Sequence, residues 1–349
     1  MSDTLKQQFL QDAGWSGATE QAIGSDWSPR KMVRLSRNAQ TAILMQSKPD
    51  DHPEAPPGHK IADYVRIATY LRGLNLKVPE VYAASPELGF LLAEDFGDES
   101  FHALLSDPTV SPEALYVNAT DILMHLYEHT VINDIELPLY FDSYVHTGRR
   151  RVMDWYAPLV RNRKNEDGLT QYYLNLWGDI ERALPAPPMR FLHVDFHPHN
   201  LMWVPDAQGG GRTGLLDFQG AMRGPAVYDL VNLLEDARRE VPAGIQNMCL
   251  LRFQKAMSPE AWDSFSAWYP VLACQFHCRV LGQAIRLASQ GKSDLLQYIP
   301  TLQNYIQTDL LHPALWPMES FFRENGIDFS RPVKIDLQAL KPLIRDDAF

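Results

Sequence analysis

Three histidines and one aspartate fall within seven consecutive positions, in the stretch FLHVDFHPHNLMW at residues 191–203. An aspartate can accept the proton of a reacting hydroxyl group, and histidine and aspartate side chains also bind metal ions. Along an extended segment alternate side chains point the same way, so these four side chains could form one metal cluster. They are His193, Asp195, His197 and His199. The residues alone therefore allow either a metal cluster or a single catalytic aspartate in a supporting loop.

The residues that follow the cluster favour the second possibility. Two short strand-like runs, Leu201–Val204 and Thr213–Asp217, flank the connection PDAQGGGR, which lacks the spacing of a G-x-x-x-x-G-K-[ST] phosphate loop. A hairpin of these runs would bring Asn200 at one end close to Asp217 at the other. Phosphoryl transfer needs oxygen ligands of this kind for magnesium, and a separate carboxylate that orients the attacking hydroxyl group.

The two motifs resemble those of a known family. HVDFHPHN followed by LLDFQG is similar to the H-x-D-x-x-x-x-N and D-x-x-[GD] signatures of aminoglycoside phosphotransferase-like kinases. The resemblance implies ATP, Mg²⁺ and an α+β, two-lobed protein-kinase-like fold, with a small β-rich lobe and a larger, mainly helical lobe. It implies that Asp195 is the catalytic base and that His193 supports the catalytic loop. Asn200 and Asp217 would bind magnesium on the nucleotide phosphates.

Other functions stay open beside this resemblance. His197 and His199 occupy variable positions between the base and the metal-binding asparagine, where each could contact the substrate or shape the loop. A metal-dependent hydrolase is the alternative of another class, although the order of residues differs from the H-x-H-x-D-H pattern of binuclear zinc hydrolases. A non-catalytic nucleotide-binding module is a further alternative, but such a module would not need Asp195.

The nucleotide-binding part of the pattern departs from that of other kinases. Kinases of this fold usually carry a lysine on the third strand that contacts the phosphates and pairs with an acid on the next helix. Here the third strand reads TAILMQS, and the candidate positions hold Leu44, Met45 and Gln46. The nearest basic residues are Lys31, Arg34 and Lys48. The acid on the helix is Asp63, so no pair matches cleanly.

Two more segments are expected to contact the nucleotide. IGSDWSPRK, at residues 23–31, takes the place of the turn that covers the phosphates, where Ser25 and Lys31 are candidate contacts. Backbone groups of the linker near Glu94 and Phe96 are expected to bind adenine.

The tripeptide DFG at residues 95–97 has the same sequence as the metal-binding DFG motif of protein kinases. It precedes the catalytic loop, whereas the metal-binding aspartate of these kinases follows that loop. Asp95 is therefore expected to be a solvated acid in a linker turn.

The acceptor is predicted from a closer resemblance. FLHVDFHPHNLMW, LLDFQGAMRGPAVYDLVNLLEDAR and QFHCRVLG look most like the anomeric kinases of cell-wall recycling. That resemblance implies transfer to the C1 hydroxyl of N-acetylmuramate and N-acetylglucosamine, giving sugar 1-phosphates in peptidoglycan recycling. The candidate substrate-binding residues are His197, Gln219, Arg223, His277 and Arg279. Aminoglycosides and small amino alcohols such as choline and homoserine remain the alternative acceptors.

Regular elements must hold these residues in place. In the first hundred residues a β-β-α-β-β pattern is predicted, over Lys31–Leu35, Thr41–Gln46, Ile61–Leu74, Val78–Ala83 and Phe90–Glu94. Ser111-Pro112-Glu113 is typical of a helix start. Further helical patterns lie near 140–160, 168–184, 241–257 and 259–290. We therefore expect a nucleotide-binding lobe over 1–97, with a linker near 94–97, and a catalytic and substrate-binding lobe over 98–349.

The composition bounds the class of protein. A chain of 349 residues is long enough for two domains. Its net charge of −11 argues against non-specific binding of nucleic acid, and no secretory signal or membrane-spanning run is evident. The expected partners are the amino sugar and ATP, with no nucleic acid and no membrane. The protein is expected to be a cytoplasmic monomer.

The three cysteines fit a reducing cytoplasm better than a disulfide scaffold, because the set is odd and sparse. Cys274, His277 and Cys278 could be metal ligands on one helical face. The surrounding sequence is largely apolar, however, and free cysteines are usually buried, so packing in the core is favoured.

Overall fold

The computed structural model describes residues 3–24, 30–55, 58, 60–130, 134–205 and 210–349. Contacts between Cα atoms divide the chain into two compact units. The first unit comprises residues 1–136 and 193–221, and the second comprises 137–192 and 222–349. The segment with the predicted catalytic residues thus belongs to the same unit as the N-terminal sheet. The predicted functional boundary near 94–97 is a different division of the chain and stays a prediction.

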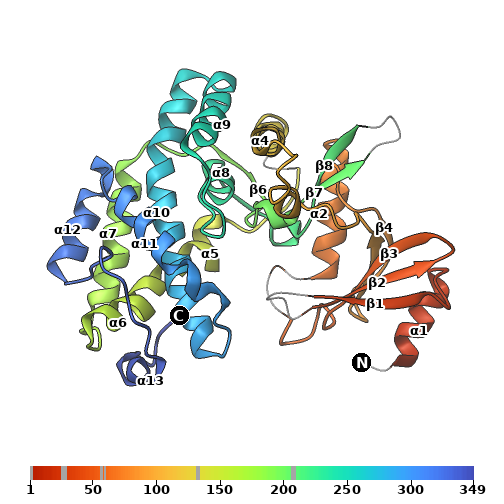
Figure 1. Ribbon diagram of the computed structural model, residues 1–349, viewed down its shortest axis with the longest axis horizontal. Helices are drawn as coiled ribbons and strands as arrows, with labels where there is room; N and C mark the ends of the chain where they lie inside the picture. Colours follow the sequence, from red (N-terminus) through yellow and green to blue (C-terminus); the bar gives the residue numbers. More distant parts are fainter. Residues whose placement is uncertain (1–2, 25–29, 56–57, 59, 131–133, 206–209) are drawn as a thin grey trace. The chain divides into compact units, whose positions relative to one another are not determined.

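An antiparallel sheet of five strands forms the N-terminal part of the first unit, in the order β1-β2-β3-β5-β4. The strands are β1 (Thr19–Ile23), β2 (Lys31–Arg37), β3 (Gln40–Gln46), β4 (Val81–Ser85) and β5 (Phe90–Glu94). The predicted hairpin and the two later strands are therefore confirmed, whereas β1 was not expected. Figure 1 shows the helix α1 (Asp3–Asp12), also not expected, beside these strands.

One face of the sheet packs against α1. Along β2 the residues Val33 and Leu35 are buried, and along β3 the residues Ala42 and Leu44 are buried, as alternation predicts. These side chains form a cluster with Phe9 and Leu10 of α1 and with Phe90 and Leu92 of β5. Met32 and Met45, which pair across β2 and β3, have the opposite parity and point to the other face.

Side chains satisfy backbone N–H groups at the start of two helices of the first unit. Asp50 accepts hydrogen bonds from the backbone N–H groups of Ile61 and Ala62, each at 2.8 Å, and thereby caps α2 (Ile61–Gly73). The side chain of Ser111 accepts from the N–H group of Ala114 at the start of α4 (Pro112–His129), as predicted. A short helix, α3 (Phe101–Leu104), precedes α4.

The first unit also contains the hairpin of β7 (Leu201–Pro205) and β8 (Gly211–Leu215). Single turns of 3₁₀ helix flank it at η4 (Pro198–Asn200) and η5 (Phe218–Gly220). Its register pairs Leu201 with Leu215 and Pro205 with Gly211. The predicted hairpin is therefore confirmed.

The second unit is mainly helical, apart from a strand pair of β6 (Met189–Leu192) and β9 (Met222–Pro225). Its α-helices are α5 (Tyr144–Thr147), α6 (Ala157–Arg161), α7 (Leu169–Ala183), α8 (Val227–Leu234), α9 (Ala243–Ala256), α10 (Pro259–Ser289), α11 (Ile299–Asp309), α12 (Trp316–Glu324) and α13 (Leu337–Leu340). Its 3₁₀ and π-helical segments are η1 (Tyr140–Asp142), η2 (Gly148–Arg150), η3 (Val152–Tyr156), η6 (Asp294–Tyr298), η7 (Pro313–Leu315) and η8 (Lys341–Leu343). The predicted helices are confirmed, and the α+β class with them.

The central helix α10 forms much of the core of the second unit. Cys274 and Cys278 of α10 are fully buried in a large apolar cluster with Val152 of η3, Trp177 of α7 and Phe322 of α12. The three cysteines are all free and buried. The prediction that the cysteines of α10 pack in the core is therefore confirmed.

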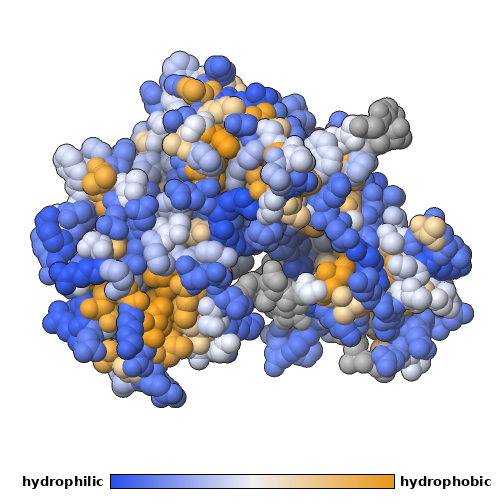
Figure 2. All heavy atoms as spheres, in the orientation of Figure 1, coloured by the Kyte–Doolittle hydropathy of each residue, from blue (hydrophilic) through white to orange (hydrophobic). Residues whose placement is uncertain are grey.

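The visible surface is mostly hydrophilic, with apolar side chains gathered on the second unit around α6 and α13 (Figure 2). Among the described residues, no helix is both long enough and apolar enough to cross a membrane. The longest helix, α10, has 31 residues and carries charged side chains such as Arg279 and Arg286.

Candidate active site

The β7–β8 hairpin holds the two predicted magnesium ligands at one of its ends. The backbone N–H group of Leu216 donates to the carbonyl oxygen of Asn200 at 2.9 Å, directly beyond the paired Leu201 and Leu215. Asp217 is the next residue. The structure therefore brings Asn200 and Asp217 to the same end of the hairpin, as the sequence predicted.

The backbone is in the left-handed region at two places in this segment: directly before Asp195, and at Asp217 itself. Val194, directly before Asp195, has a φ of +79°, and Asp217 has a φ of +58°. Aspartate tolerates this left-handed region, whereas a β-branched valine rarely adopts it. Such strained residues persist where the surrounding fold requires them, and they gather at active sites. The strain is consistent with a loop that must aim the Asp195 carboxylate in one direction.

The amide of Asn200 ties the predicted catalytic loop together. Its Nδ2 atom donates to the backbone oxygen of Asp195 at 2.9 Å and lies 3.3 Å from Nε2 of His197. Because these contacts use the nitrogen, the amide oxygen is left to bind a cation. The hydrogen bond also fixes the distance along the loop between the predicted base and the predicted magnesium ligand.

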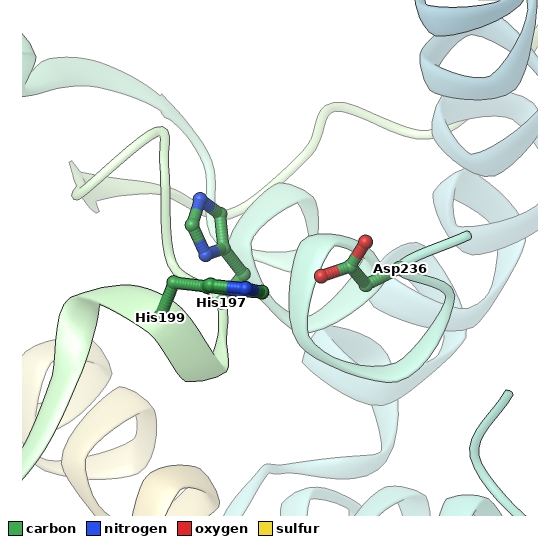
Figure 3. A group of neighbouring side chains, drawn as sticks. All are labelled: His197, His199 and Asp236. Atoms are coloured by element: carbon green, nitrogen blue, oxygen red, sulfur yellow. The ribbon is translucent and has the colours of Figure 1, made fainter. Parts of the chain in front are cut away.

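The three histidines of the cluster have different surroundings. The rings of His197 and His199 lie 5.6 Å apart and nearly perpendicular (Figure 3), and His199 stacks on His102 at 3.7 Å. Asp236, which Figure 3 also labels, belongs to the second unit. His193 is fully buried and packs edge-on against Phe196.

Burial decides the charge of His193. Its pKa is lowered to about 4, because burial disfavours the imidazolium more than the nearby Asp217 charge and the Leu216 backbone favour it. The ring is therefore neutral at physiological pH. A buried, neutral ring fits the loop-supporting role that the resemblance implied, and that role stays a prediction.

Asp217 is held by two donors on one carboxylate oxygen. Nη2 of Arg30 lies 2.6 Å from Oδ1 of Asp217, and Nε2 of Gln219 donates to the same oxygen at 2.7 Å. Burial raises the pKa of Asp217. The Arg30 charge and these hydrogen bonds lower it by more than burial raises it, so the net shift is downward. The carboxylate is therefore ionised and oriented before any ligand binds.

These residues fit a magnesium ion. Asp217 offers an ionised carboxylate and Asn200 an amide oxygen, which are the hard ligands that magnesium prefers. The buried Oε1 atom of Gln219, beside Asp217, has no hydrogen-bond partner among the described residues. A buried acceptor of this kind calls for a donor, such as a metal-bound water or a substrate hydroxyl group.

The residues predicted to contact the nucleotide differ in exposure and in hydrogen bonding. Lys31 is exposed at the start of β2, and Ser25 lies outside the described residues. The Glu94 carboxylate accepts from Nζ of Lys77 at 2.7 Å and from the N–H group of Glu80 at 3.1 Å. Its side chain is thus engaged within the unit, and its backbone N–H group donates to the carbonyl oxygen of Glu80 at 2.8 Å. The adenine contact of the linker backbone stays a prediction.

Phe96 in the same linker is buried. The Lys77 ammonium lies 4.9 Å from the centre of its ring, and a Cβ atom at Gly214 would lie 2.6 Å from the ring. The ring therefore packs against β8 and requires glycine at position 214. Phe96 positions the linker in this structure, and its contact with adenine stays a prediction.

The prediction of a solvated Asp95 is wrong. Its side chain is only 4% exposed, and Nε of Arg34 on β2 lies 2.6 Å from its Oδ2 atom. The turn itself is as predicted, since Gly97 has a φ of +79° and donates its N–H to Asp95. Asp95 is buried because Arg34 reaches across the sheet to neutralise it.

Sequence reasoning missed Arg30. The three basic residues nearest the third strand in sequence have other surroundings: Arg34 is paired with Asp95, Lys48 with Glu54, and Lys31 is exposed. Alternation offered a signal, because residue 30 has the parity of Met32 and Arg34 and so faces away from the α1 core. Ending the predicted strand at Lys31 concealed it.

The remaining predicted substrate contacts belong to the second unit. Arg223 on β9 is exposed, which leaves its guanidinium accessible. Nη2 of Arg279 donates to the Tyr228 hydroxyl group at 2.9 Å, and its guanidinium lies 5.3 Å from the centre of the Phe276 ring. The roles of both arginines stay predictions.

His277 is fully buried, which disfavours the predicted contact with substrate. Its Nδ1 atom lies 2.8 Å from Oδ2 of Asp309, and its Nε2 atom lies 3.5 Å from Oε2 of Glu235. Burial lowers the pKa of His277, but the two carboxylates outweigh burial and raise it. The His277 imidazole therefore lies between two buried carboxylates in the core of the second unit and partly neutralises them.

This network predicts that the protein is less stable at higher pH. Burial raises the pKa of Glu235 to about 7, against the charge of His277 and a hydrogen bond to Tyr269. Above that pH the folded state must hold a buried carboxylate. The stabilisation from protonated His277 is lost as the pH rises through the raised pKa of that histidine. Glu235→Gln is expected to raise the melting temperature at pH 8 by about 2 °C or more and to leave it nearly unchanged at pH 4, below the ordinary pKa of glutamate. An equal change in melting temperature at both pH values would contradict this account.

Sequence comparisons agree with the motifs. The family described as "Phosphotransferase enzyme family" matches residues 19–268. The N-acetylmuramate/N-acetylglucosamine kinase of Caulobacter vibrioides is 28% identical, over 92% of this chain and 95% of the relative. The kinase of the same name from Neisseria meningitidis serogroup B is 31% identical, over 73% of this chain and 76% of the relative.

Solved structures share the fold. A GDP complex of wild-type aminoglycoside 2'-phosphotransferase-IIIa matches with a TM-score of 0.61 at 14% identity, over 88% of this chain and 100% of that chain. A microcompartment-associated aminopropanol kinase matches with a TM-score of 0.59 at 16% identity, over 89% of this chain and 99% of that chain. These similarities confirm the predicted protein-kinase-like fold.

Proposed function

The chain belongs to the phosphotransferase enzyme family, and we propose that it phosphorylates the anomeric C1 hydroxyl of N-acetylmuramate and N-acetylglucosamine. Membership of the family makes the protein a small-molecule kinase with a hydroxyl acceptor. The names of its relatives support a sugar as that acceptor. ATP is the proposed phosphoryl donor, and peptidoglycan recycling is the proposed role.

One observation carries the proposal. The hairpin end holds an ionised Asp217 beside Asn200, and Asn200 is hydrogen-bonded to the backbone of Asp195 at 2.9 Å. A cation-binding pair and a separate carboxylate are thus joined through a single side chain. This combination suits phosphoryl transfer, which depends mainly on positioning and on stabilising charge.

The proposed reaction assigns one task to each residue. Asp195 accepts the proton of the C1 hydroxyl as the sugar oxygen bonds to the γ-phosphorus, and the bond to the bridging oxygen of ADP breaks. Asn200 and Asp217 would hold magnesium, which supplies charge neutralisation on the phosphate oxygens when it is bound. An anomeric hydroxyl is more acidic than an ordinary alcohol, so a carboxylate suffices as its base.

The residues proposed to contact the sugar are four of those predicted from the sequence. Gln219 and His197 are candidates from the first unit, where Gln219 has a buried acceptor atom beside Asp217. Arg223 and Arg279 are candidates for the carboxylate of N-acetylmuramate, because arginine offers paired donors to a carboxylate. We also propose a cytoplasmic, monomeric enzyme, in keeping with ATP as its donor.

Release of ADP with a panel of acceptors tests the substrate class. The panel contains N-acetylmuramate, N-acetylglucosamine, glucose, kanamycin, choline and homoserine, each with MgATP. We expect the two N-acetyl sugars to give the highest kcat/KM, with glucose lower because it lacks the acetamido group. Preferred turnover of kanamycin, choline or homoserine would overturn the proposed acceptor and keep the fold. If none of these acceptors led to release of ADP, the result would argue against the proposal.

A further inference from the structure

Arg30 is a buried cation joined to a residue far along the chain. Its side chain is 6% exposed, and Nη2 lies 2.6 Å from Oδ1 of Asp217, which is 37% exposed. Its Nη1 atom lies 3.7 Å from the sulfur of Met45 on β3. The guanidinium thus sits between the strand position where kinases of this fold carry a lysine and the predicted magnesium ligand.

In kinases of this fold an acid on the next helix pairs with the strand lysine, but the acid on α2 pairs with another residue. This acid, Asp63, is paired instead with Arg66 at 2.8 Å. The neighbouring Tyr64 is buried and lies within electrostatic reach of both Arg30 and Asp217. Its ring packs at a tilt against Phe218, with the ring centres 4.7 Å apart. The carboxylate that the structure shows for Arg30 is therefore the one proposed to bind metal.

Two charges compete for that carboxylate. A divalent cation on Asp217 would lie within a few ångströms of the Arg30 guanidinium, and like charges at such distances repel strongly in a partly buried site. A buried cation that loses its partner needs another anion. Gln219 is neutral and donates to the same oxygen at 2.7 Å, so it can keep Asp217 oriented while Arg30 leaves.

We propose that Arg30 is the phosphate-binding cation of the nucleotide site, taking the place of the lysine that β3 lacks, and that it exchanges Asp217 for the phosphates of the bound nucleotide. The inference rests on the proposed kinase function. In the ligand-free state Arg30 is paired with Asp217 at 2.6 Å. When the nucleotide binds with its metal, the guanidinium turns to the phosphate oxygens, which match its donors.

Nucleotide binding without an acceptor tests this exchange. Isothermal titration would be carried out on the wild type, Arg30→Gln, Arg30→Lys and the control Arg72→Gln, with MgADP, the magnesium complex of a non-hydrolysable ATP analogue, and adenosine as ligands. Glutamine can still donate to Asp217 but carries no charge. Arg30→Gln is expected to weaken binding of both phosphorylated ligands roughly 10- to 100-fold. Adenosine, which lacks phosphates, should bind all four proteins alike.

The other variants separate charge from folding. Arg30→Lys should regain part of the lost affinity, and Arg72→Gln, which removes an exposed charge from the last turn of α2, should bind like the wild type. Wild-type affinity of Arg30→Gln for MgADP would overturn the proposal. An equal loss for adenosine would overturn it too, since the variant would then have damaged the site as a whole. Because no acceptor is present, a wrong sugar assignment leaves this result unaffected.

Discussion

Replacing Asp195 with asparagine is expected to lower kcat by a factor of about 10²–10⁴, which is the usual contribution of a general base. Asparagine keeps the size of the side chain but cannot accept the proton of the sugar hydroxyl. The fold should hold, because the bond that Asn200 makes to residue 195 goes to its backbone oxygen. Steady-state kinetics with N-acetylglucosamine would measure kcat, and titration with MgADP would measure nucleotide affinity.

Glu128→Gln is a matched control, since it removes one exposed carboxylate from α4. It should leave both kcat and nucleotide affinity unchanged. For Asp195→Asn, nucleotide affinity should stay at the wild-type value. A variant that turns over sugar at the wild-type rate would show that Asp195 is not the base. A loss of nucleotide affinity as large as the loss of kcat would point to a role in binding instead.

Replacing Asp217 with asparagine should damage both activity and stability. The variant keeps an oxygen ligand but loses its charge, so kcat should fall by about 10²-fold or more, and the concentration of Mg²⁺ needed for half-maximal rate should rise. It also leaves the buried Arg30 guanidinium without the carboxylate at 2.6 Å. The free energy of unfolding should drop by about 1–3 kcal/mol, below the full penalty for a buried pair because Asp217 is partly exposed.

Urea unfolding and a Mg²⁺ titration of the rate would check the two effects separately. The double variant Arg30→Gln/Asp217→Asn should be less destabilised than the sum of the single variants, since the second change removes the stranded charge. An unchanged requirement for Mg²⁺ in Asp217→Asn would contradict the assignment of this residue as a ligand. Strictly additive losses of stability would contradict the ion pair.

Local patterns made the catalytic end of the site predictable. The hairpin of β7 and β8 follows from two short apolar runs and a glycine-rich connection, and its register alone brings Asn200 next to Leu216 and Asp217. The strands and helices with clear periodicity were found for the same reason. β1 escaped because all five of its residues are exposed, so it shows no alternation.

Contacts between distant residues could not be predicted. Arg30 and Asp217 are 187 positions apart, and no local pattern announces that they meet. Arg34 buries Asp95 from 61 positions away, which turned an expected solvated acid into a neutralised one. His277 looked like a possible substrate contact because its partner Asp309, 32 residues later on α11, becomes its neighbour only when the helices pack.

The most direct test of the account is phosphorus-31 NMR of the product formed from MgATP and N-acetylglucosamine. The methyl glycoside, in which the C1 hydroxyl is blocked, serves as the control acceptor. We predict a new phosphomonoester signal that couples to the anomeric proton, and no product from the methyl glycoside. A phosphomonoester coupled to protons at C6, or equal turnover of the methyl glycoside, would contradict phosphorylation at the anomeric hydroxyl.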